Sequence, residues 1–265
     1  MIEACDVLNI MQKKNRTNPE WVNRDVYRLL YNRSLHILAY ERIKSKPGNM
    51  TPGIDEKTLD GFSLETIDEQ IELLRQEKYQ PAPVRRTYIP KEGGQRPLGV
   101  PSPRDKIVQE CVRLILEAIY EPGFHPNSHG FRPNRSCHTA LESLRRNWVG
   151  TKWVLKLDIA ECFERIDHHR LLDILRERIQ DDRFINLIRK FLTAGYLENW
   201  VYFQTYSGTP QGSGISPILT NIYLDKLDQK LDSLCQEQSL GERRRATSER
   251  AALMKERRQL LEQGE

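Results

Sequence analysis

A long amphipathic helix is the strongest structural signal in the sequence. After Pro103, "RDKIVQECVRLILEAIYEP" repeats apolar residues at intervals of three and four, and Pro122-Gly123 ends the pattern. One stripe of this helix holds Ile107, Val108, Cys111, Leu114, Ile115 and Ile119. The chain has 265 residues, of which 38% are apolar and 29% charged. It is therefore long enough to bury a core, in one large domain or two modest ones, under a heavily solvated surface.

The segment before this helix predicts a β-hairpin. In "PVRRTYIPKEGGQRPLGVPS" (83–102), two β-prone runs flank a Gly-Gly turn. Lys91 and Arg96 then stand on opposite arms, with Arg85 and Arg86 on the arm that leads in. Two cations placed in this way can both bind one triphosphate. Considered alone, a solvated basic hairpin explains them equally well.

The composition excludes some classes of protein. No apolar run approaches the roughly 20 residues that cross a bilayer, and the N-terminus lacks the order of a signal peptide. Five scattered cysteines form no C-x-x-C pair, which favours reduced, intracellular thiols over a disulfide framework. The net charge of +4 indicates no partner by itself.

Apolar spacing and turn residues place the remaining elements. We expect a helix or helix pair within 21–46, and helices at 64–76, 168–179, 182–193 and from about 217 onward. The Pro- and Gly-rich segment 45–55 predicts a loop, and residues 200–208 are β-prone. Beyond about residue 236 the chain is nearly all charged, which predicts either an exposed helix or a disordered insertion.

An apolar run that ends on a carboxylate indicates a candidate metal site. Residues 153–159 alternate like a β-strand and carry Asp158 at its end. An Asp at this place commonly caps the next turn, but Mg²⁺ also takes hard oxygen ligands and is held by one or two carboxylates plus substrate phosphates. Phe163 follows five residues later, where its ring can lie beside a nucleotide sugar and exclude a 2′-hydroxyl; ordinary core packing is the alternative.

A second polar segment is "TPQGSGISP" (209–217), which is too rich in Gly and Pro to fill a core. It is typical of a surface loop that introduces the helix from about 217. This reading leaves Gln211 unexplained, an amide between Pro and Gly on a loop whose glycines let another backbone or a base approach closely.

Basic residues gather between 132 and 156, with six Lys or Arg and a single acid, Glu142. They indicate either a solvated helix face or a phosphate-binding surface. The neighbouring "FHPNSHGFRPNRSCH" (124–138) holds three histidines and a cysteine without the paired spacing of a zinc module, so a structured loop with phosphate-contacting arginines is the better interpretation.

Taken in order, these segments resemble the reverse transcriptases of the group II intron-encoded reverse transcriptase/maturase family. The resemblance rests on four strings: "KPGNMTPGIDEKTLDGF" (46–62), "YIPKEGGQRPLGVPSPRDKIVQECVRLILEAIYEPGFHPNSHGFRPNRS" (88–136), "LDIAECFERIDHHRLLDIL" (157–175) and "GTPQGSGISPILTNIYLDKLD" (208–228). It implies an α+β right-hand polymerase, with helix-rich fingers that carry a β-hairpin and a palm built on an antiparallel sheet.

The resemblance also implies roles for particular residues. Asp158 is the first catalytic metal ligand, and the backbone carbonyl of Ile159 contacts the same ion. Phe163 is the sugar gate that favours deoxynucleotides, and Gln211 lines the incoming-nucleotide pocket. Lys91 and Arg96 hold the triphosphate. Residues expected to contact nucleic acid are Arg85, Arg86, Arg132, Arg135, Arg145 and Arg146.

The sequence departs from the family pattern in one respect. The family's other two metal carboxylates lie in an aromatic-x-Asp-Asp turn after the 208–228 string, and no such turn occurs here. The adjacent pair Asp181-Asp182 precedes Gln211 in a polar helix–helix turn, so we reject it as a substitute. We therefore expect the sequence to be the N-terminal part of a longer protein or a truncated one.

The expected organisation is an N-terminal extension and start of the fingers (1–60), fingers running into a palm helix (61–150), palm with returning fingers helices (151–235) and a charged insertion (236–265). The expected function of the complete protein is RNA-directed DNA synthesis, with intron-RNA binding that assists splicing and mobility. The alternatives are an RNA-binding maturase fragment without polymerase activity, or a reverse transcriptase of another bacterial lineage.

The resemblance implies Mg²⁺ as cofactor, two ions in the complete enzyme, with Mn²⁺ as an alternative. The implied partners are intron RNA, an RNA template with a DNA primer, and dNTPs, without a membrane; a homodimer stays open. The implied location is the bacterial cytoplasm, at the nucleoid when the protein acts on DNA.

Overall fold

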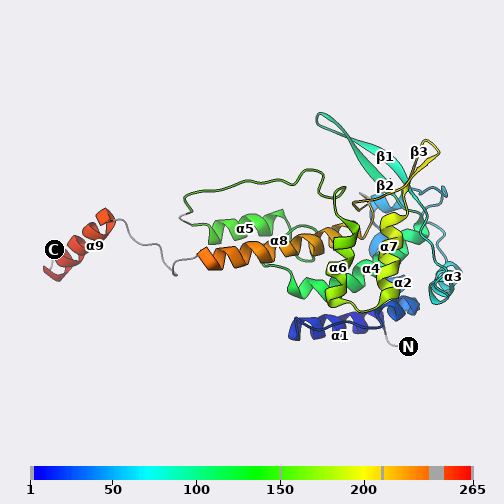
Figure 1. Cartoon of the computed structure of the whole chain (residues 1–265), viewed down its shortest axis with the longest axis horizontal. Coiled ribbons are helices and arrows are strands. Elements are labelled where there is room, and N and C mark those ends of the chain that lie inside the picture. Colours follow the sequence, from blue (N-terminus) through cyan, green and yellow to red (C-terminus); the bar gives the residue numbers. More distant parts are fainter. Residues whose placement is uncertain (1–2, 150, 210–211, 239–247, 264–265) are drawn as a thin grey trace. The chain divides into compact units, whose positions relative to one another are not determined.

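Helix α4 (Pro103–Tyr120) is the centre of the core in the computed structural model (Figure 1). Fifteen of its eighteen residues are buried, well beyond the single apolar stripe that the sequence predicts. The reason is that α4 is covered on several sides, by α1 (Ala4–Thr17), α2 (Arg33–Lys44) and the 3₁₀ helices η1 (Val26–Tyr31) and η3 (Glu121–Gly123). Polar residues of α4 are buried together with the apolar ones.

The structure describes residues 3–149, 151–209, 212–238 and 248–263. The chain divides into two compact units, 1–226 and 227–265. Besides the elements named above, the described residues form η2 (Pro47–Met50), α3 (Leu64–Arg75), β1 (Val84–Lys91), β2 (Gly94–Val100), α5 (Cys137–Asn147), α6 (His168–Arg178), α7 (Asp182–Thr193), β3 (Tyr196–Glu198), β4 (Val201–Phe203), α8 (Ser216–Gln238) and α9 (Ser248–Gln263).

Most of the helices lie where apolar spacing predicts them. The predictions for α3, α4, α6, α7 and α8 are confirmed, and the helix pair expected within 21–46 consists of η1 and α2. Helix α1 was not predicted, because its buried residues are only Ala4 and Asn15 and the apolar signal is correspondingly weak. No helix in the described part of the chain combines the length and hydropathy that a membrane crossing requires.

The sheet is built on the predicted hairpin and has the strand order β2-β1-β3-β4. Strands β1 and β2 are antiparallel, with Ile89 opposite Arg96 and Lys91 opposite Gly94. Strand β3 pairs with β1 in parallel, and β4 returns antiparallel to β3. The sheet is therefore mixed rather than antiparallel throughout, because β3 joins the hairpin after a long connection through α4–α7.

The strand predicted at 153–159 is not formed, and that prediction was wrong for the described structure. Residues 151–159 have no regular secondary structure and lie in the long loop that links α5 to α6 in Figure 1. Trp153, Leu155 and Leu157 are 86%, 80% and 80% exposed. A segment with alternating apolar residues forms a stable strand only when a neighbouring strand makes backbone hydrogen bonds with it. None of the described strands pairs with this segment.

Two charged residues at the start of α4 are buried and hydrogen-bonded. The Asp105 carboxylate accepts hydrogen bonds from the Ala82 backbone N–H (3.0 Å), the Ser102 hydroxyl (2.9 Å) and the Tyr79 hydroxyl. Lys106 donates from Nζ to the carbonyls of Asn49 (2.7 Å) and Thr51 (2.6 Å). The first turn of α4 therefore binds both the start of the hairpin and the 45–55 loop.

In the second unit, α9 is exposed along its described side chains. This agrees with the exposed-helix alternative for the charged C-terminal segment, since helix α9 is charged around its circumference and has no apolar face wide enough to bury.

Replacement of Asp105 tests the role of α4 in the fold. We expect Asp105→Ala to lower the free energy of unfolding by about 3–5 kcal/mol, because it leaves buried donors without an acceptor. Urea denaturation followed by circular dichroism measures this. The control is Asp68→Ala, which removes an exposed ion pair with Arg33 (2.8 Å) and should cost at most about 1 kcal/mol. Equal losses in the two variants would contradict the assignment.

Candidate functional site

The candidate site begins where two distant segments are joined by backbone hydrogen bonds. Thr209 donates its N–H to the carbonyl of Phe163, and Gly208 donates to that of Ile166, both at 2.7 Å. His168 Nε2 lies 2.7 Å from the Gly208 carbonyl oxygen. Gly208 has φ of +79°, and a Cβ there would lie 2.5 Å from the Glu164 carbonyl oxygen, so only glycine fits. The turn carrying Phe163 and the start of the Gln211 loop are thus fixed together.

The far end of the same loop is held by α4. The Gln109 side chain is 3% exposed, and its Oε1 accepts hydrogen bonds from the Ser213 hydroxyl (3.0 Å) and the Gly214 N–H (3.2 Å). Gly212 lies against β2, where a Cβ would be 2.6 Å from the Gly99 carbonyl oxygen. Gln211 itself lies outside the described residues, but the loop is anchored on both sides of it.

Gln109 is a functional candidate that sequence analysis missed. It lies within the predicted helix but off its apolar stripe, so the pattern gave it no role. The only available signal was its place between apolar residues in a helix expected to be buried. An amide in that position must find partners, and the sequence does not show that Ser213 and Gly214 supply them.

Asp158 lies in the exposed loop before the Phe163 turn. The Cys162 pKa is raised by burial of the thiol and, to a lesser extent, by the negative charges of Glu164 and Asp158. The Phe163 ring is half-buried and meets Phe131 edge to face, with ring centroids 6.4 Å apart.

The donor chemistry of Asp158 fits Mg²⁺, as a carboxylate does, and Ile159 can add its carbonyl. Among the described residues, however, there is no group of three or more His, Cys, Asp or Glu side chains arranged to hold a metal ion. A pair of ions needs more carboxylates than Asp158 alone.

Three of the four predicted hairpin cations share one face of the ribbon. Because Ile89 is opposite Arg96 and Lys91 opposite Gly94, Lys91 and Arg96 project from the same side, together with Arg85 nearer the base. Arg86 projects from the other side, where its guanidinium lies over the Tyr196 ring, 4.2 Å from the centroid. The hairpin therefore presents two distinct cationic faces.

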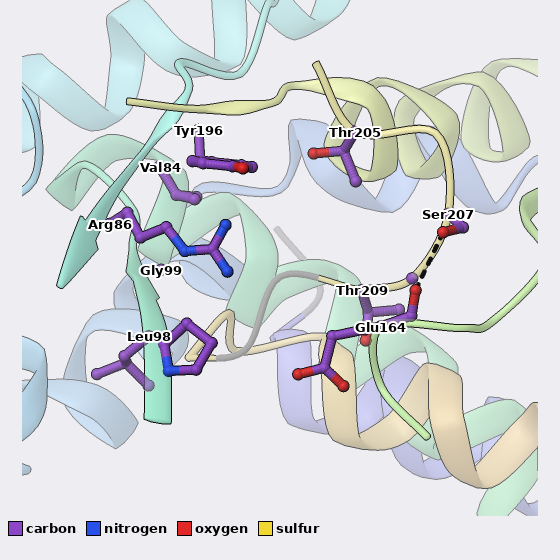
Figure 2. Close-up of a pocket in the computed structure, with 11 residues that line it drawn as sticks. Val84, Arg86, Leu98, Gly99, Glu164, Tyr196, Thr205, Ser207 and Thr209 are labelled. Carbon is purple, nitrogen blue, oxygen red and sulfur yellow. Dashed lines mark hydrogen bonds between the residues drawn. The ribbon is translucent and has the colours of Figure 1, made fainter. Parts of the chain in front are cut away.

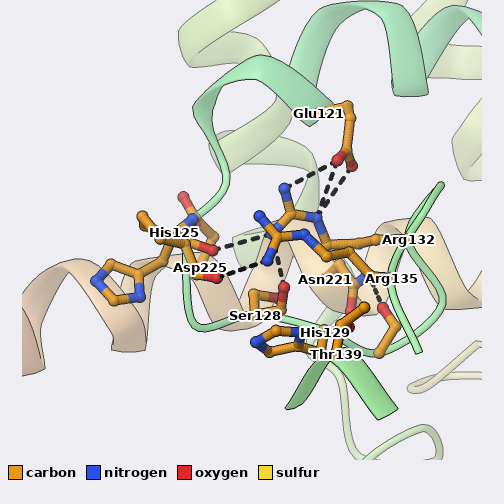
Figure 3. Close-up of polar contacts among 11 residues, drawn as sticks. Glu121, His125, Ser128, His129, Arg132, Arg135, Thr139, Asn221 and Asp225 are labelled. Carbon is orange, nitrogen blue, oxygen red and sulfur yellow. Dashed lines mark hydrogen bonds and ion pairs between the residues drawn. The ribbon is translucent and has the colours of Figure 1, made fainter. Parts of the chain in front are cut away.

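Arg132 occupies a different position from the one its predicted role requires. Its side chain is 5% exposed, and its guanidinium donates to both carboxylate oxygens of Glu121 and to the carbonyls of His125 (2.9 Å) and Ser128 (2.7 Å) (Figure 3). It also lies over the Phe124 ring. These contacts fix the 124–136 loop and do not favour a phosphate contact by Arg132.

The other arginines of this region are exposed. Arg135 donates to the Pro126 carbonyl at 3.2 Å, while Arg145 and Arg146 extend from α5 and share Glu142. Both pairs with Glu142 are exposed, so they contribute little stability and leave the basic face accessible. The loop bearing Arg135 is held to α8 by Asn221, which donates to the Gly130 carbonyl at 2.8 Å.

Asp181 has the structural role that its sequence context indicates. Its carboxylate caps α7 by accepting from the N–H groups of Arg183 (3.2 Å) and Phe184 (3.4 Å), and it accepts from the Tyr27 N–H at 2.9 Å. The rejection of the Asp181-Asp182 pair as a metal site agrees with this use.

Comparison with known proteins identifies the family. The pattern of the family described as "Reverse transcriptase (RNA-dependent DNA polymerase)" matches residues 89–241, more than half of the chain. The chain belongs to the reverse transcriptase family. The matched range contains Lys91, Arg96, Asp158, Phe163 and the Gln211 loop, so these parts of the candidate site lie in the segment that carries the family's pattern.

Individual relatives confirm the resemblance to group II intron-encoded proteins. The "Group II intron-encoded protein LtrA" of Lactococcus lactis subsp. cremoris is 48% identical over 84% of this chain and 38% of its own length. The "Uncharacterized 91 kDa protein in cob intron" of Schizosaccharomyces pombe is 48% identical over 86% of this chain and 28% of its own. The "Nuclear intron maturase 4, mitochondrial" of Arabidopsis thaliana is 28% identical over 63% and 22%.

The chain spans well under half the length of these three relatives. Among solved structures, a partial Cas6-RT-Cas1–Cas2 complex is similar with a TM-score of 0.52 at 23% identity, over 78% of this chain and 35% of that one. This likeness shows the fold alone, and it confirms the predicted α+β reverse transcriptase fold.

The anchoring of the Gln211 loop by α4 makes a testable prediction. We expect Gln109→Leu to speed amide hydrogen exchange at 212–216 by about 10- to 100-fold, because the Gly214 N–H and the Ser213 hydroxyl lose their buried acceptor. Exchange measured by mass spectrometry on overlapping peptides gives the local effect.

The matched control is Gln70→Leu, an equally buried amide whose Nε2 donates to the Arg104 carbonyl at 2.8 Å. It should leave exchange at 212–216 unchanged relative to the rest of the chain. The same acceleration in both variants would mean that Gln109 acts only through global stability.

Proposed function

We propose that the protein to which this chain belongs is an RNA-directed DNA polymerase of a group II intron, and that it also binds the intron RNA. The observation that carries the proposal is the Thr209–Phe163 hydrogen bond, which joins the start of the Gln211 loop to the turn that follows Asp158 in the chain. Family membership and the identity with LtrA support the reaction class. The substrates are an RNA template, a DNA primer and dNTPs.

Different residues of the chain bind different parts of the incoming nucleotide. Lys91 and Arg96, on one face of the hairpin, bind the triphosphate, Arg through paired N–H donors and Lys as a point charge. Phe163 lies beside the sugar and excludes a 2′-hydroxyl. Gln211, for which the family resemblance implies a place in the nucleotide pocket, lies outside the described residues; its described neighbours Thr209 and Ser213 are anchored by Phe163 and Gln109.

Asp158 and the carbonyl of Ile159 would hold Mg²⁺, with Mn²⁺ as a substitute. When bound, such an ion neutralises charge on the reacting phosphate and activates the attacking hydroxyl. The carboxylates needed for a second ion are to be sought in the remainder of the complete protein.

RNA binding is proposed for the exposed basic residues. Arg135, Arg145 and Arg146 present cationic side chains around α5, and phosphate contacts of this kind make binding depend strongly on salt. Arg85 lies on the same face of the hairpin as Lys91 and Arg96, nearer its base, and is proposed to contact the template. For Arg132 we propose a structural role in holding the 124–136 loop instead, because its guanidinium donates hydrogen bonds to Glu121 and to two backbone carbonyls.

Replacement of Asp158 separates the two proposed activities. In the complete protein, Asp158→Asn should reduce Mg²⁺-dependent primer extension on an RNA template by at least about 10³-fold, because the neutral amide is a poor metal ligand. Intron-RNA affinity should change less than about twofold. Asp167→Asn, at the exposed N-cap of α6, is the matched control and should retain extension. Normal extension by Asp158→Asn would show that Asp158 is not the metal ligand.

A further inference from the structure

The hairpin that carries Lys91 and Arg96 pairs with the rest of the described sheet only near its base. Strand β1 pairs with β3 at two residues, Val84 and Arg85. Beyond Arg85, β2 is the only described strand that pairs with β1, and the hairpin continues as a two-stranded ribbon (Figure 1). Lys91 is six residues further on, about 20 Å along an extended strand. Because two-stranded ribbons twist easily, a small tilt at the base displaces both cations.

One side-chain hydrogen bond joins this ribbon to β3. The Tyr88 hydroxyl donates to the Glu198 carboxylate, although the two residues are 110 positions apart in the chain. Tyr88 lies three residues beyond Arg85, and Glu198 is the last residue of β3, so the bond lies just past the last backbone pair. The same bond is the main reason that the pKa of Tyr88 is raised, so the hydroxyl remains a donor at neutral pH.

A second contact lies on the same face of the sheet. The Arg86 guanidinium lies over the Tyr196 ring, 4.2 Å from its centroid (Figure 2). The Tyr196 ring in turn stacks on Phe203, with centroids 5.1 Å apart and planes 13° from parallel. These three side chains form a row across β1, β3 and β4, so they hold the base of the hairpin against the other two strands.

Both contacts lie on the face of the hairpin opposite the triphosphate cations. Side chains alternate along a strand, so Arg86 and Tyr88 project away from the side that carries Lys91 and Arg96. The carboxylate of Glu198 would also repel a triphosphate. These residues therefore do not contact the incoming nucleotide, and they affect it through the position of the hairpin.

We propose that Tyr88 and Glu198 are positioning residues, and that their hydrogen bond holds the hairpin at the angle at which Lys91 and Arg96 bind the incoming nucleotide. The proposal rests on the nucleotide-binding role proposed above for those two cations. Without the bond the hairpin adopts a wider range of angles, and only the molecules with the correct angle bind dNTP at full strength. Loss of the bond therefore weakens the apparent affinity for dNTP and leaves the reacting groups unchanged.

Steady-state primer extension by the complete protein tests the proposal. Tyr88→Phe removes the donor and keeps the ring, so it should raise the dNTP KM by about three- to fivefold and change kcat by less than about twofold. Glu198→Ala removes the acceptor and should raise the dNTP KM by a similar factor. The variant with both changes should be no worse than either single variant, because the two changes remove the same bond.

Glu198→Gln separates the hydrogen bond from the charge of the carboxylate. The amide oxygen of glutamine still accepts from Tyr88, so the dNTP KM should stay within about twofold of that of the unaltered protein. If Glu198 acted only through its charge, both Glu198→Ala and Glu198→Gln would lower the dNTP KM, because each removes a negative charge near the site of an anionic substrate. A lower KM in both variants would contradict the proposal.

Amide hydrogen exchange in the same protein measures the local effect. Tyr88→Phe and Glu198→Ala should both speed exchange in peptides that cover 194–199 by about three- to fivefold. The reason is that the short pairing of β1 with β3 opens more often once no side-chain bond closes its end. Unchanged exchange in both variants would show that the bond does not hold the hairpin.

Two matched controls remove similar groups elsewhere. Tyr206→Phe deletes an exposed hydroxyl that donates to Gln204 at 3.1 Å, within two residues of its own position. Glu72→Ala deletes an exposed carboxylate that accepts from Gln76 at 2.6 Å, within α3. Both controls should keep the dNTP KM and the exchange at 194–199 unchanged.

Lys91→Ala distinguishes failure of this proposal from failure of the proposed function. If Lys91→Ala raises the dNTP KM while Tyr88→Phe and Glu198→Ala behave like their controls, the positioning role is wrong and the nucleotide-binding role of the hairpin stands. If Lys91→Ala leaves the dNTP KM unchanged, the hairpin does not bind the nucleotide. The positioning role then fails as well, even where exchange at 194–199 is faster.

Discussion

The buried polar end of α4 is the interaction on which the rest of the structure depends. Asp105, Lys106 and Gln109 lie within five consecutive residues, and each is at most 7% exposed. A buried charge or amide is tolerated only when its hydrogen bonds are made. Their partners lie in three separate segments: the start of the hairpin, the 45–55 loop and the 209–214 loop. Each partner segment is therefore held because α4 would otherwise bury unpaired polar groups.

This arrangement explains how a site is assembled from loops. The Gln211 loop is bound at one end to the Phe163 turn and at the other to Gln109, and it lies against β2 through Gly212. Asp105 accepts a hydrogen bond from the Ala82 backbone N–H, and strand β1 begins shortly afterwards at Val84. The hairpin that carries Lys91 and Arg96 is therefore anchored near its base. The apolar part of α4 supplies a rigid centre, and its polar end aligns the loops around it.

Much of the fold could be predicted from sequence, because helical periodicity and a Gly-Gly turn are local signals. The shared face of Lys91 and Arg96 likewise follows from strand alternation once the turn is placed. Features that depend on distant partners could not be predicted. Gln109 acquires its role from Ser213, Arg132 is engaged by Glu121, and residues 153–159 have the alternation of a strand without a neighbour to pair with. Whether Gln211 reaches a nucleotide stays a prediction.

The most direct test of this account is the pKa of the Lys106 ammonium, measured by NMR titration of its side chain. Burial of Nζ lowers this pKa from 10.5 to about 8, although the Asp55 charge opposes the shift. Because the unfolded chain then binds the proton more tightly, Lys106 should make stability rise between pH 8 and 10.5. A pKa near 8 is the expected result. A value near 10.5 would show that Lys106 is solvated and that α4 does not hold the 45–55 loop.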